Sequence, residues 1–472
     1  MEQVTVAALA GGVRQIARRQ LDDLAANLRG QVLYPADEGF AGATTIWNGM
    51  IKKSPAAVLQ PESAEDVVQA VIFARDNGLE LAIKGGGHNI AGLALSDGGV
   101  VLDMARLRQV DVDPDARLAR VGAGCNLGDV DRATQAHGLA TTLGFVSLTG
   151  IAGLTVGGGF GYLSRRFGWT TDDLEEVEVV TADGQLRRAS RTQDEDLFWA
   201  IRGGGGNFGV VTEFVFRLHP IGPQVMAGPI AWPAAEAESV VEVFRRTAET
   251  SPRELTLVVA RRNAPPAPWL PEAAHGTPVV MIIACHSGSL DQAAADLAAI
   301  KSHGQPLADL IQPKEYVAQQ SMLDATMPNG NYYYWKSEFV PGLSDDLLRA
   351  YNEQFVGMKA PANQGVLFQI DGALNEQPED DGAVGNRDAA FACVLQSMWR
   401  PETDAEAGAS NREWVRRGWQ AIKPFSTGGN YVNFQTADDP DERTQESYRA
   451  NYRRLEEVKA RHDPDNVFRV NR

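Results

Sequence analysis

The sequence predicts an α+β fold with two domains, one carrying glycine-rich loops and the other built of sheet strands with helices between them. At 472 residues the chain is too long for one ordinary hydrophobic core, so two domains are expected. Three glycine clusters, within 85–87, 150–161 and 203–209, lie in the first half of the chain. From 224 to 424 these clusters vanish, and apolar runs with strand and helix periods alternate instead.

The first half carries the signals of helices and of short strands. Apolar residues at helical spacing predict a helix over 13–29. Ser63, followed by acidic residues, predicts a capped helix that begins just after it. Short apolar runs predict strands at 99–103, 118–122, 177–181 and 212–218.

The end of this first half is marked by turn residues. Ala182-Asp183-Gly184 is typical of a hairpin turn after the strand that precedes it. The alternation in 212–218 predicts an edge or half-buried strand, and Pro220 and Pro223 end it. We therefore expect the domain boundary after residue 223.

The middle region carries sheet strands with helices between them. Strands are predicted at 255–260, 278–284 and 365–371, and helices at 290–300 and 344–355. Because this region offers aromatic and polar side chains rather than glycine-rich backbone, 224–424 is the predicted substrate domain. Beyond it, 428–434 is predicted to be a polar, glycine-led strand, and 441–461 a charged helix.

Composition and charge limit the possible partners. With 44 basic and 61 acidic side chains the net charge is −17, which disfavours nucleic acid or an anionic membrane surface as a partner. No apolar stretch approaches the length of a spanning helix, and the N-terminus lacks the features of a signal peptide, so a cytoplasmic protein is expected. The histidines show no metal-ligand spacing, and no metal site is predicted. Cys125, Cys285 and Cys393 are expected to be small core residues.

The run from Lys84 to Gly92 places one histidine, His88, in a glycine-rich turn directly after a strand-like segment. Glycine allows backbone N–H groups to converge on a phosphate because no Cβ blocks positive φ or close approach. The run therefore predicts a loop that binds a large anionic cofactor.

Five motifs in family order resemble those of the vanillyl-alcohol-oxidase/p-cresol-methylhydroxylase superfamily of flavin oxidoreductases, and more narrowly its berberine-bridge-enzyme-like bacterial branch. They are the loop 85–88, the segments 150–161 and 202–209, Tyr431-Val432-Asn433, and the tail 463–468. A single glycine cluster is often only a turn, but five in order are specific.

This resemblance implies the two-domain PCMH-type FAD-binding fold with an antiparallel-sheet substrate domain. Residues 1–223, with a core over about 53–222, are then the FAD-binding domain, and 224–424 the substrate-binding domain. The berberine-like segment 425–472 completes the FAD domain, because Tyr431-Val432-Asn433 returns to the flavin.

The resemblance also implies FAD as the cofactor, with its pyrophosphate on the loop 85–92 and its ring facing the middle domain. In the family the histidine that matches His88 is bonded to the flavin 8α-methyl carbon, which raises the flavin potential. The alternative is that His88 only caps the loop through its ring nitrogens. The other predicted cofactor-binding residues are Lys84, Gly85, Gly86, Gly87, Asn89, Gly92, Thr149, Gly150, Gly153, Thr155, Gly157, Gly158, Gly159, Gly161 and Asn433.

One departure from the family concerns a second covalent link. Many relatives attach the flavin to a cysteine as well, and the alignment of the 150–161 glycines places Val146 at that position. We therefore predict a single covalent link, through His88.

The resemblance implies that Tyr431 lies near the flavin N5 and deprotonates a substrate hydroxyl while hydride passes to the flavin. A tyrosine pKa is ordinarily near ~10, so the phenol needs help to act near neutrality. Gln369 and Asp371 are two residues apart on a predicted strand, so both are expected on one face as catalytic residues. Asp371 is expected either to accept the proton of Tyr431 or to orient its hydroxyl. The alternatives are a core tyrosine and an aspartate that caps the turn at Gly372.

The predicted reaction is oxidation of a small organic substrate, an alcohol, sugar, phenolic or polyketide metabolite or amine, with molecular oxygen reduced to hydrogen peroxide. No nicotinamide-binding fingerprint is present, which favours oxygen as the acceptor. Thr149 is expected beside the flavin where oxygen approaches, so an internal monooxygenase is one alternative, and a dehydrogenase is another. A non-catalytic flavin-binding protein or a non-flavin phosphate-binding fold stays open, as do the substrate and the oligomeric state.

Overall fold

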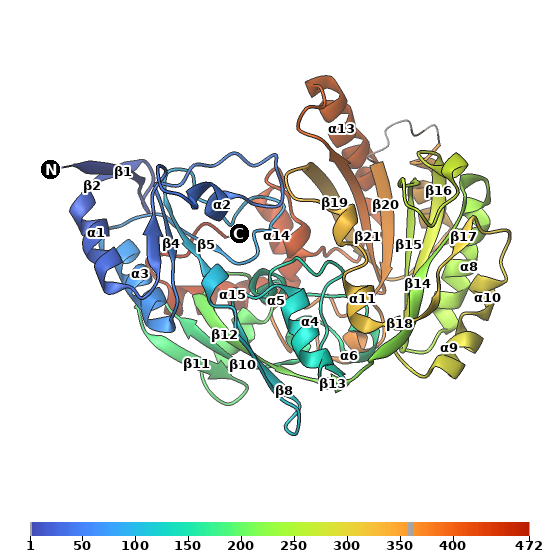
Figure 1. Cartoon of the computed structure of the whole chain (residues 1–472), viewed down its shortest axis with the longest axis horizontal. Helices are drawn as coiled ribbons and strands as arrows, with labels where there is room; N and C mark the ends of the chain where they lie inside the picture. The colour runs from blue at the N-terminus through green and yellow to red at the C-terminus, as the bar shows by residue number, and fades with distance from the viewer. Residues whose placement is uncertain (1, 357, 359–362, 472) are drawn as a thin grey trace.

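The computed structural model describes residues 2–356, 358 and 363–471. Its elements gather around two sheet regions that lie side by side, with the first half of the chain in one and the middle of the chain in the other (Figure 1). The last two helices, α14 (Asp441–Tyr448) and α15 (Tyr452–His462), return to the side of the first half (Figure 1). Within the described ranges, no helix combines the length and the apolar character needed to cross a membrane.

The first region holds two main sheets. A four-stranded sheet has the order β3 (Gln31–Leu33), β4 (Ala57–Gln60), β6 (Val100–Asp103) and β5 (Leu81–Lys84). A five-stranded antiparallel sheet has the order β11 (Leu186–Ser190), β10 (Leu174–Val180), β12 (Val210–Arg217), β8 (Leu118–Gly122) and β7 (Val110–Asp113). The predicted hairpin between β10 and β11 is confirmed.

Two local predictions for this region are wrong. Residues 13–17 form strand β2 (Val13–Ala17), paired with β1 (Gln3–Ala7), and only then does helix α1 (Arg18–Asn27) begin. The alternating strand β12 lies between β10 and β8, so it is a central strand rather than an edge. Its outward residues are covered by neighbouring elements, which periodicity within one segment does not reveal.

Helix α3 (Ala64–Asp76) begins as predicted. The Ser63 side chain accepts a hydrogen bond from the Asp66 backbone N–H at 3.2 Å, and Glu65 and Asp66 place negative charge in the first turn. The further short elements of this region are α2 (Phe40–Thr44), α4 (Leu127–Gln135), β9 (Leu139–Ala140), α5 (Ile151–Val156), α6 (Ser164–Phe167), α7 (Glu195–Ile201) and β13 (His219–Pro220).

The second region is an eight-stranded antiparallel sheet. Its order is β17 (Ala308–Asp309), β14 (Gln224–Pro233), β16 (Pro278–His286), β15 (Leu255–Asn263), β20 (Asn363–Gln369), β21 (Phe391–Trp399) and β19 (Tyr332–Val340), with β18 (Gln312–Glu315) also on β14. Helices pack on one face: α8 (Ala237–Thr250), α12 (Asp345–Glu353) and α13 (Ala405–Ile422). Helices α9 (Leu290–Asp296), α10 (Ala298–Lys301) and α11 (Tyr316–Gln320) lie between strands in the sequence.

The C-terminal segment differs from its prediction in two places. Residues 432–434 form a 3₁₀ turn instead of a strand. The predicted helix over 441–461 is two helices, α14 (Asp441–Tyr448) and α15 (Tyr452–His462), because Arg449 takes a positive φ of 49° between them. Val458 and Phe468 are fully buried in the hydrophobic core of the first region, so this segment is anchored there.

Candidate active site

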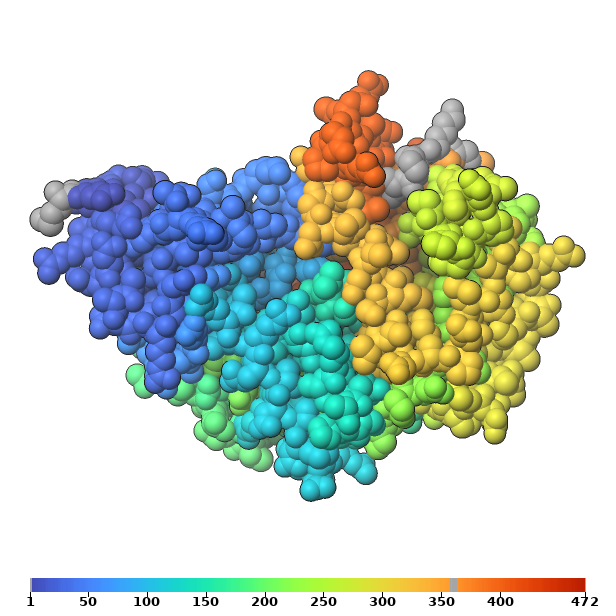
Figure 2. All heavy atoms as spheres, in the orientation of Figure 1, coloured from blue at the N-terminus to red at the C-terminus, as the bar shows by residue number. Residues whose placement is uncertain are grey.

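A cavity of about 1600 Å³ lies where the two regions meet. Its wall takes residues from the glycine-rich loops, from the open face of the eight-stranded sheet and from the C-terminal segment. In the space-filling view, teal elements of the first region meet the yellow and orange elements of the second along one face (Figure 2). Ligand pockets typically measure about 300–1,000 Å³, so this cavity has room for a dinucleotide and a second molecule.

Two glycine runs form one end of the cavity and touch each other there. A Cβ on Gly86 would collide with the backbone of Gly150, and a Cβ on Gly150 with that of Gly86, so only glycine allows this approach. Gly87 needs a positive φ of 69°, and the Cβ position of Gly153 has no atom within 4 Å. The backbone is therefore open toward the cavity, as the pyrophosphate of FAD requires.

His88 lies at this end as an uncharged ring. Burial lowers its pKa to about 4, so the imidazole is neutral at physiological pH. The ring stacks on Trp47 with centroids 5.5 Å apart, and its Nδ1 lies 3.5 Å from the Thr149 hydroxyl. A neutral, oriented imidazole nitrogen is the form that can bond to carbon.

Several predicted cofactor-binding residues lie in the cavity wall. With His88 these are Gly85, Gly86, Gly87, Asn89, Thr149, Gly150, Gly153 and Asn433. Outside the wall are Lys84, Gly92, Thr155, Gly157, Gly158, Gly159 and Gly161.

Three of the residues outside the wall make contacts within the protein. Lys84 pairs with Asp103 at 3.1 Å. The 157–161 glycines allow close packing within the protein: a Cβ on Gly157 would collide with the Asn433 side chain, and one on Gly161 with a backbone carbonyl. A glycine-rich sequence does not by itself show which glycines line a cavity and which allow close packing within the protein.

Tyr431 lines the cavity and holds two hydrogen bonds on its phenolic oxygen. The backbone N–H of Gly159 donates to it at 3.1 Å, and the Asn433 side-chain amide donates at 2.9 Å. Burial raises the pKa of Tyr431 to about 12, while the two donors oppose that rise because they stabilise the phenolate. Phe160 and Phe434 pack edge-on against the ring, with centroids 5.0 and 4.9 Å away.

The expected pairing of Tyr431 with Asp371 is wrong. Strand β20 ends at Gln369, so Asp371 leaves the sheet and pairs with the buried Arg165 at 2.8 Å. Gln369 points to the opposite face of the sheet, where its amide donates to the Ala248 carbonyl at 3.0 Å. Neither side chain is part of the cavity wall, because the two-residue spacing applies only while the strand continues.

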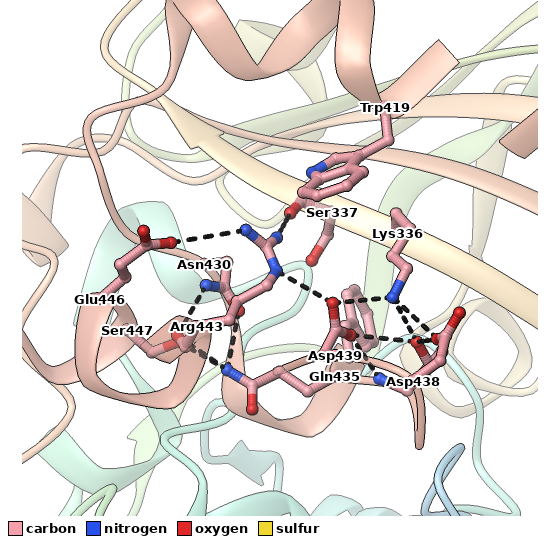
Figure 3. Close-up of polar contacts among 12 residues, drawn as sticks. Lys336, Ser337, Trp419, Asn430, Gln435, Asp438, Asp439, Arg443, Glu446 and Ser447 are labelled. Atoms are coloured by element: carbon pink, nitrogen blue, oxygen red, sulfur yellow. Dashed lines mark hydrogen bonds and ion pairs between the residues drawn. The ribbon is translucent and has the colours of Figure 1, made fainter. Parts of the chain in front are cut away.

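A buried ion network ties the segment that carries Tyr431 to strand β19 (Figure 3). The Lys336 ammonium lies 2.7 Å from Asp439 and 3.0 Å from Asp438. Arg443 in α14 pairs with Glu338 at 2.9 Å. Since breaking such buried pairs leaves an uncompensated charge, the network holds the Tyr431 segment in one position.

Sequence reasoning missed several wall residues. Trp47 is only 3% exposed, and it also lines the cavity. Gly205, Gly206 and Gly209 belong to a motif that supported the family resemblance without being assigned to the site, and they line the cavity too. The glycine-rich sequence of this segment could have indicated that it lines the site.

The cysteines are buried and free, as expected. In the part of the chain that the structure describes, the cavity wall includes Val146 but no cysteine. Over the described ranges, no group of three or more His, Cys, Asp or Glu side chains is arranged to hold a metal ion.

Comparison with known protein families finds two matching domains. Residues 55–190 match the FAD binding domain, and residues 430–472 match the berberine and berberine-like domain. The second match begins one residue before Tyr431, and the first includes both contacting glycine runs.

Individual relatives extend the likeness to nearly the whole chain. (R)-6-hydroxynicotine oxidase of Paenarthrobacter nicotinovorans is 29% identical over 94% of this chain and 96% of its own length. An FAD-linked oxidoreductase of Dictyostelium discoideum is 28% identical over 90% of each chain. The crystal structure of 6-hydroxy-D-nicotine oxidase from Arthrobacter nicotinovorans superposes with a TM-score of 0.82 at 27% identity, over 94% of this chain and 97% of that one. The two domain matches and these neighbours identify the chain as an FAD-linked oxidoreductase that is similar to the berberine-bridge-enzyme-like family.

Proposed function

We propose that this enzyme oxidises a small organic substrate through an FAD held by one covalent bond, to His88, and that molecular oxygen is the final acceptor. The observation that carries the proposal is the meeting of three features in one cavity: the paired glycine runs, the neutral His88 ring and the Tyr431 phenol. Its relatives include named oxidases, which favours oxygen over another acceptor.

The glycine backbone at 85–87 and 150–153 would hold the FAD pyrophosphate, and His88 would supply the attachment point. FAD, when bound, accepts a hydride from the substrate carbon and passes the electrons to oxygen, which gives hydrogen peroxide. Val146 in the wall leaves His88 as the attachment site among the described residues of the cavity.

Tyr431 is the proposed proton acceptor for the substrate hydroxyl or amine. The two N–H donors on its oxygen, from Gly159 and Asn433, favour the phenolate and aim the ring into the cavity. Gln369 and Asp371 take no part in this step, because they face other partners.

We further propose that 1–223 and 425–472 together form the FAD domain and that 224–424 form the substrate domain. The support is the packing of α15 and Phe468 against the core of the first half, and the separate eight-stranded sheet that begins at Gln224. The cavity then lies between cofactor and substrate domains.

A substrate screen that records peroxide release tests the oxidase assignment. We expect one hydrogen peroxide per substrate oxidised. Transfer of labelled oxygen into the product would instead indicate an internal monooxygenase, and turnover only with an artificial electron acceptor would indicate a dehydrogenase. A purified protein that carries no flavin would contradict catalysis by this site.

Replacing Asn433 with alanine is expected to move the alkaline limb of the pH–rate profile to higher pH. The substitution removes one of the two donors that stabilise the Tyr431 phenolate, so the pKa of Tyr431 rises and the active, deprotonated form is reached at higher pH. The rate of flavin reduction, followed by stopped-flow absorbance across pH, measures this shift. If the pH dependence of flavin reduction is the same in the variant and the wild type, Asn433 does not affect the pKa of Tyr431.

Replacing Asp371 with asparagine is expected to leave that pH profile in place. The Asp371 carboxylate pairs with Arg165, and the pKa of Tyr431 is set by burial, Asn433 and Gly159. The substitution should lower thermal stability, because Arg165 is buried and loses its charge partner. Calorimetry and the same stopped-flow series give both readouts, and a shifted pH profile would restore Asp371 to the mechanism.

A further inference from the structure

The open face of the eight-stranded sheet changes from apolar to polar along its strands. On β20 every second side chain faces the cavity: Phe368, Val366 and Gln364. On β15 the cavity-facing side chains are Val258, Ala260 and Arg262. Val258 pairs with Phe368, and Gln364 pairs with Gln396 on β21. Three adjacent strands therefore present Arg262, Gln364 and Gln396 as one polar row beyond an apolar surface.

The side chains of this polar row lack protein partners for their terminal groups. Arg262 makes one hydrogen bond, from Nε to the neighbouring Asn263 carbonyl at 3.2 Å. Over residues 2–356, 358 and 363–471, Arg262 has no ion pair, and the side-chain amides of Gln364 and Gln396 make no hydrogen bond. Burial alone lowers the pKa of the Arg262 guanidinium, since no carboxylate lies close enough to oppose the effect.

The rest of the cavity wall offers Arg262 no counter-charge. Among its described residues there is no Asp or Glu; the other arginine, Arg400, is 79% exposed and lies near Glu402. The protein as a whole is strongly acidic, with a net charge of −17. The absence of carboxylates from the described cavity wall therefore differs from the composition of the rest of the chain. Arg262 is partly exposed to the cavity, so its guanidinium is accessible to an anionic group of a bound molecule.

The polar row lies at a defined distance from the end of the sheet that adjoins Tyr431. Phe368 packs against Phe160 with centroids 5.8 Å apart, and Phe160 packs against Tyr431, so the Phe368 end is the reactive end. Phe368 lies four positions from Gln364, and Val258 lies four positions from Arg262, which is about 13 Å along an extended strand. Apolar side chains cover the sheet between the two ends.

We propose that Arg262, assisted by Gln364 and Gln396, binds a carboxylate at the far end of an elongated, mainly apolar substrate whose oxidised carbon lies beside Tyr431. This assignment rests on the proposed oxidase function and narrows its substrate to organic acids. A carboxylate fits better than a phosphate, because one guanidinium fork and two neutral amides match a monoanion in bidentate geometry.

The test is a calorimetric titration of the flavin-loaded protein with two matched probes. One is a rod-like biphenyl with a hydroxymethyl group at one end and a carboxylate at the other, and the second carries a neutral carboxamide in place of the carboxylate. We expect the wild type to bind the carboxylate at least about tenfold more tightly. Arg262→Gln should abolish this preference, and Arg262→Lys should keep part of it, because the charge stays but the planar fork is lost.

Flavin content separates this proposal from the oxidase assignment. Arg262→Gln should retain the wild-type flavin content and absorption spectrum; loss of flavin from this variant would mean that Arg262 serves the cofactor, which overturns the proposal. Equal affinity of the wild type for both probes, or binding of neither, also overturns it. Because heat of binding requires no turnover, failure of peroxide release would count against the oxidase alone.

Discussion

Replacing His88 with alanine is expected to free the flavin completely when the protein is denatured. The wild type should give a yellow pellet on acid precipitation, because the proposed covalent bond to the imidazole nitrogen would hold the flavin. The described cavity wall includes Val146 and no cysteine, so we expect the alanine variant to have no other attachment site there. Mass spectrometry should find the wild-type chain heavier by one flavin, with the modification on the peptide that contains His88.

A matched control for this experiment is Cys125→Ser. Cys125 is fully buried in the core of the first half and donates to the Gln109 carbonyl, so its replacement should leave the flavin attached. Flavin that remains bound to the denatured His88→Ala variant would show a second attachment and contradict the single link.

Replacing Tyr431 with phenylalanine is expected to slow flavin reduction by about 10² to 10⁴, the usual loss when a positioned general base is removed. The ring and its edge-on contacts with Phe160 and Phe434 remain, so the fold and the flavin spectrum should change little. The wild-type rate should rise with pH, because the phenol must lose its proton before it can accept one and burial holds its pKa high. The variant should lose this alkaline limb.

Tyr351→Phe provides the control for the loss of a buried phenol. Tyr351 lies in the helix-covered core of the eight-stranded sheet, and its hydroxyl donates to the Gly365 carbonyl at 2.8 Å. This variant should lose some stability but reduce its flavin at the wild-type rate. Stopped-flow reduction of Tyr431→Phe at wild-type speed would remove Tyr431 from the mechanism.

Features that depend on neighbours in the chain could be predicted from the sequence alone. The Ser63 cap, the 182–184 turn and the glycine loop before His88 each depend on a few adjacent residues, whose steric and hydrogen-bonding limits act locally. The order of glycine motifs likewise identified the family and its cofactor, because a phosphate-binding backbone needs glycine wherever it occurs.

Features that depend on distant segments were decided only by the tertiary structure. The partners of Tyr431 are Gly159 and Asn433, brought together by a 3₁₀ turn where a strand was expected, while Asp371 leaves its strand to neutralise Arg165. Arg262 gives no distinguishing signal in the sequence; its importance follows from the absence of any carboxylate in the described cavity wall. The physical reason is that desolvation and charge pairing depend on which residues surround a group in space, and spacing along one strand does not specify them.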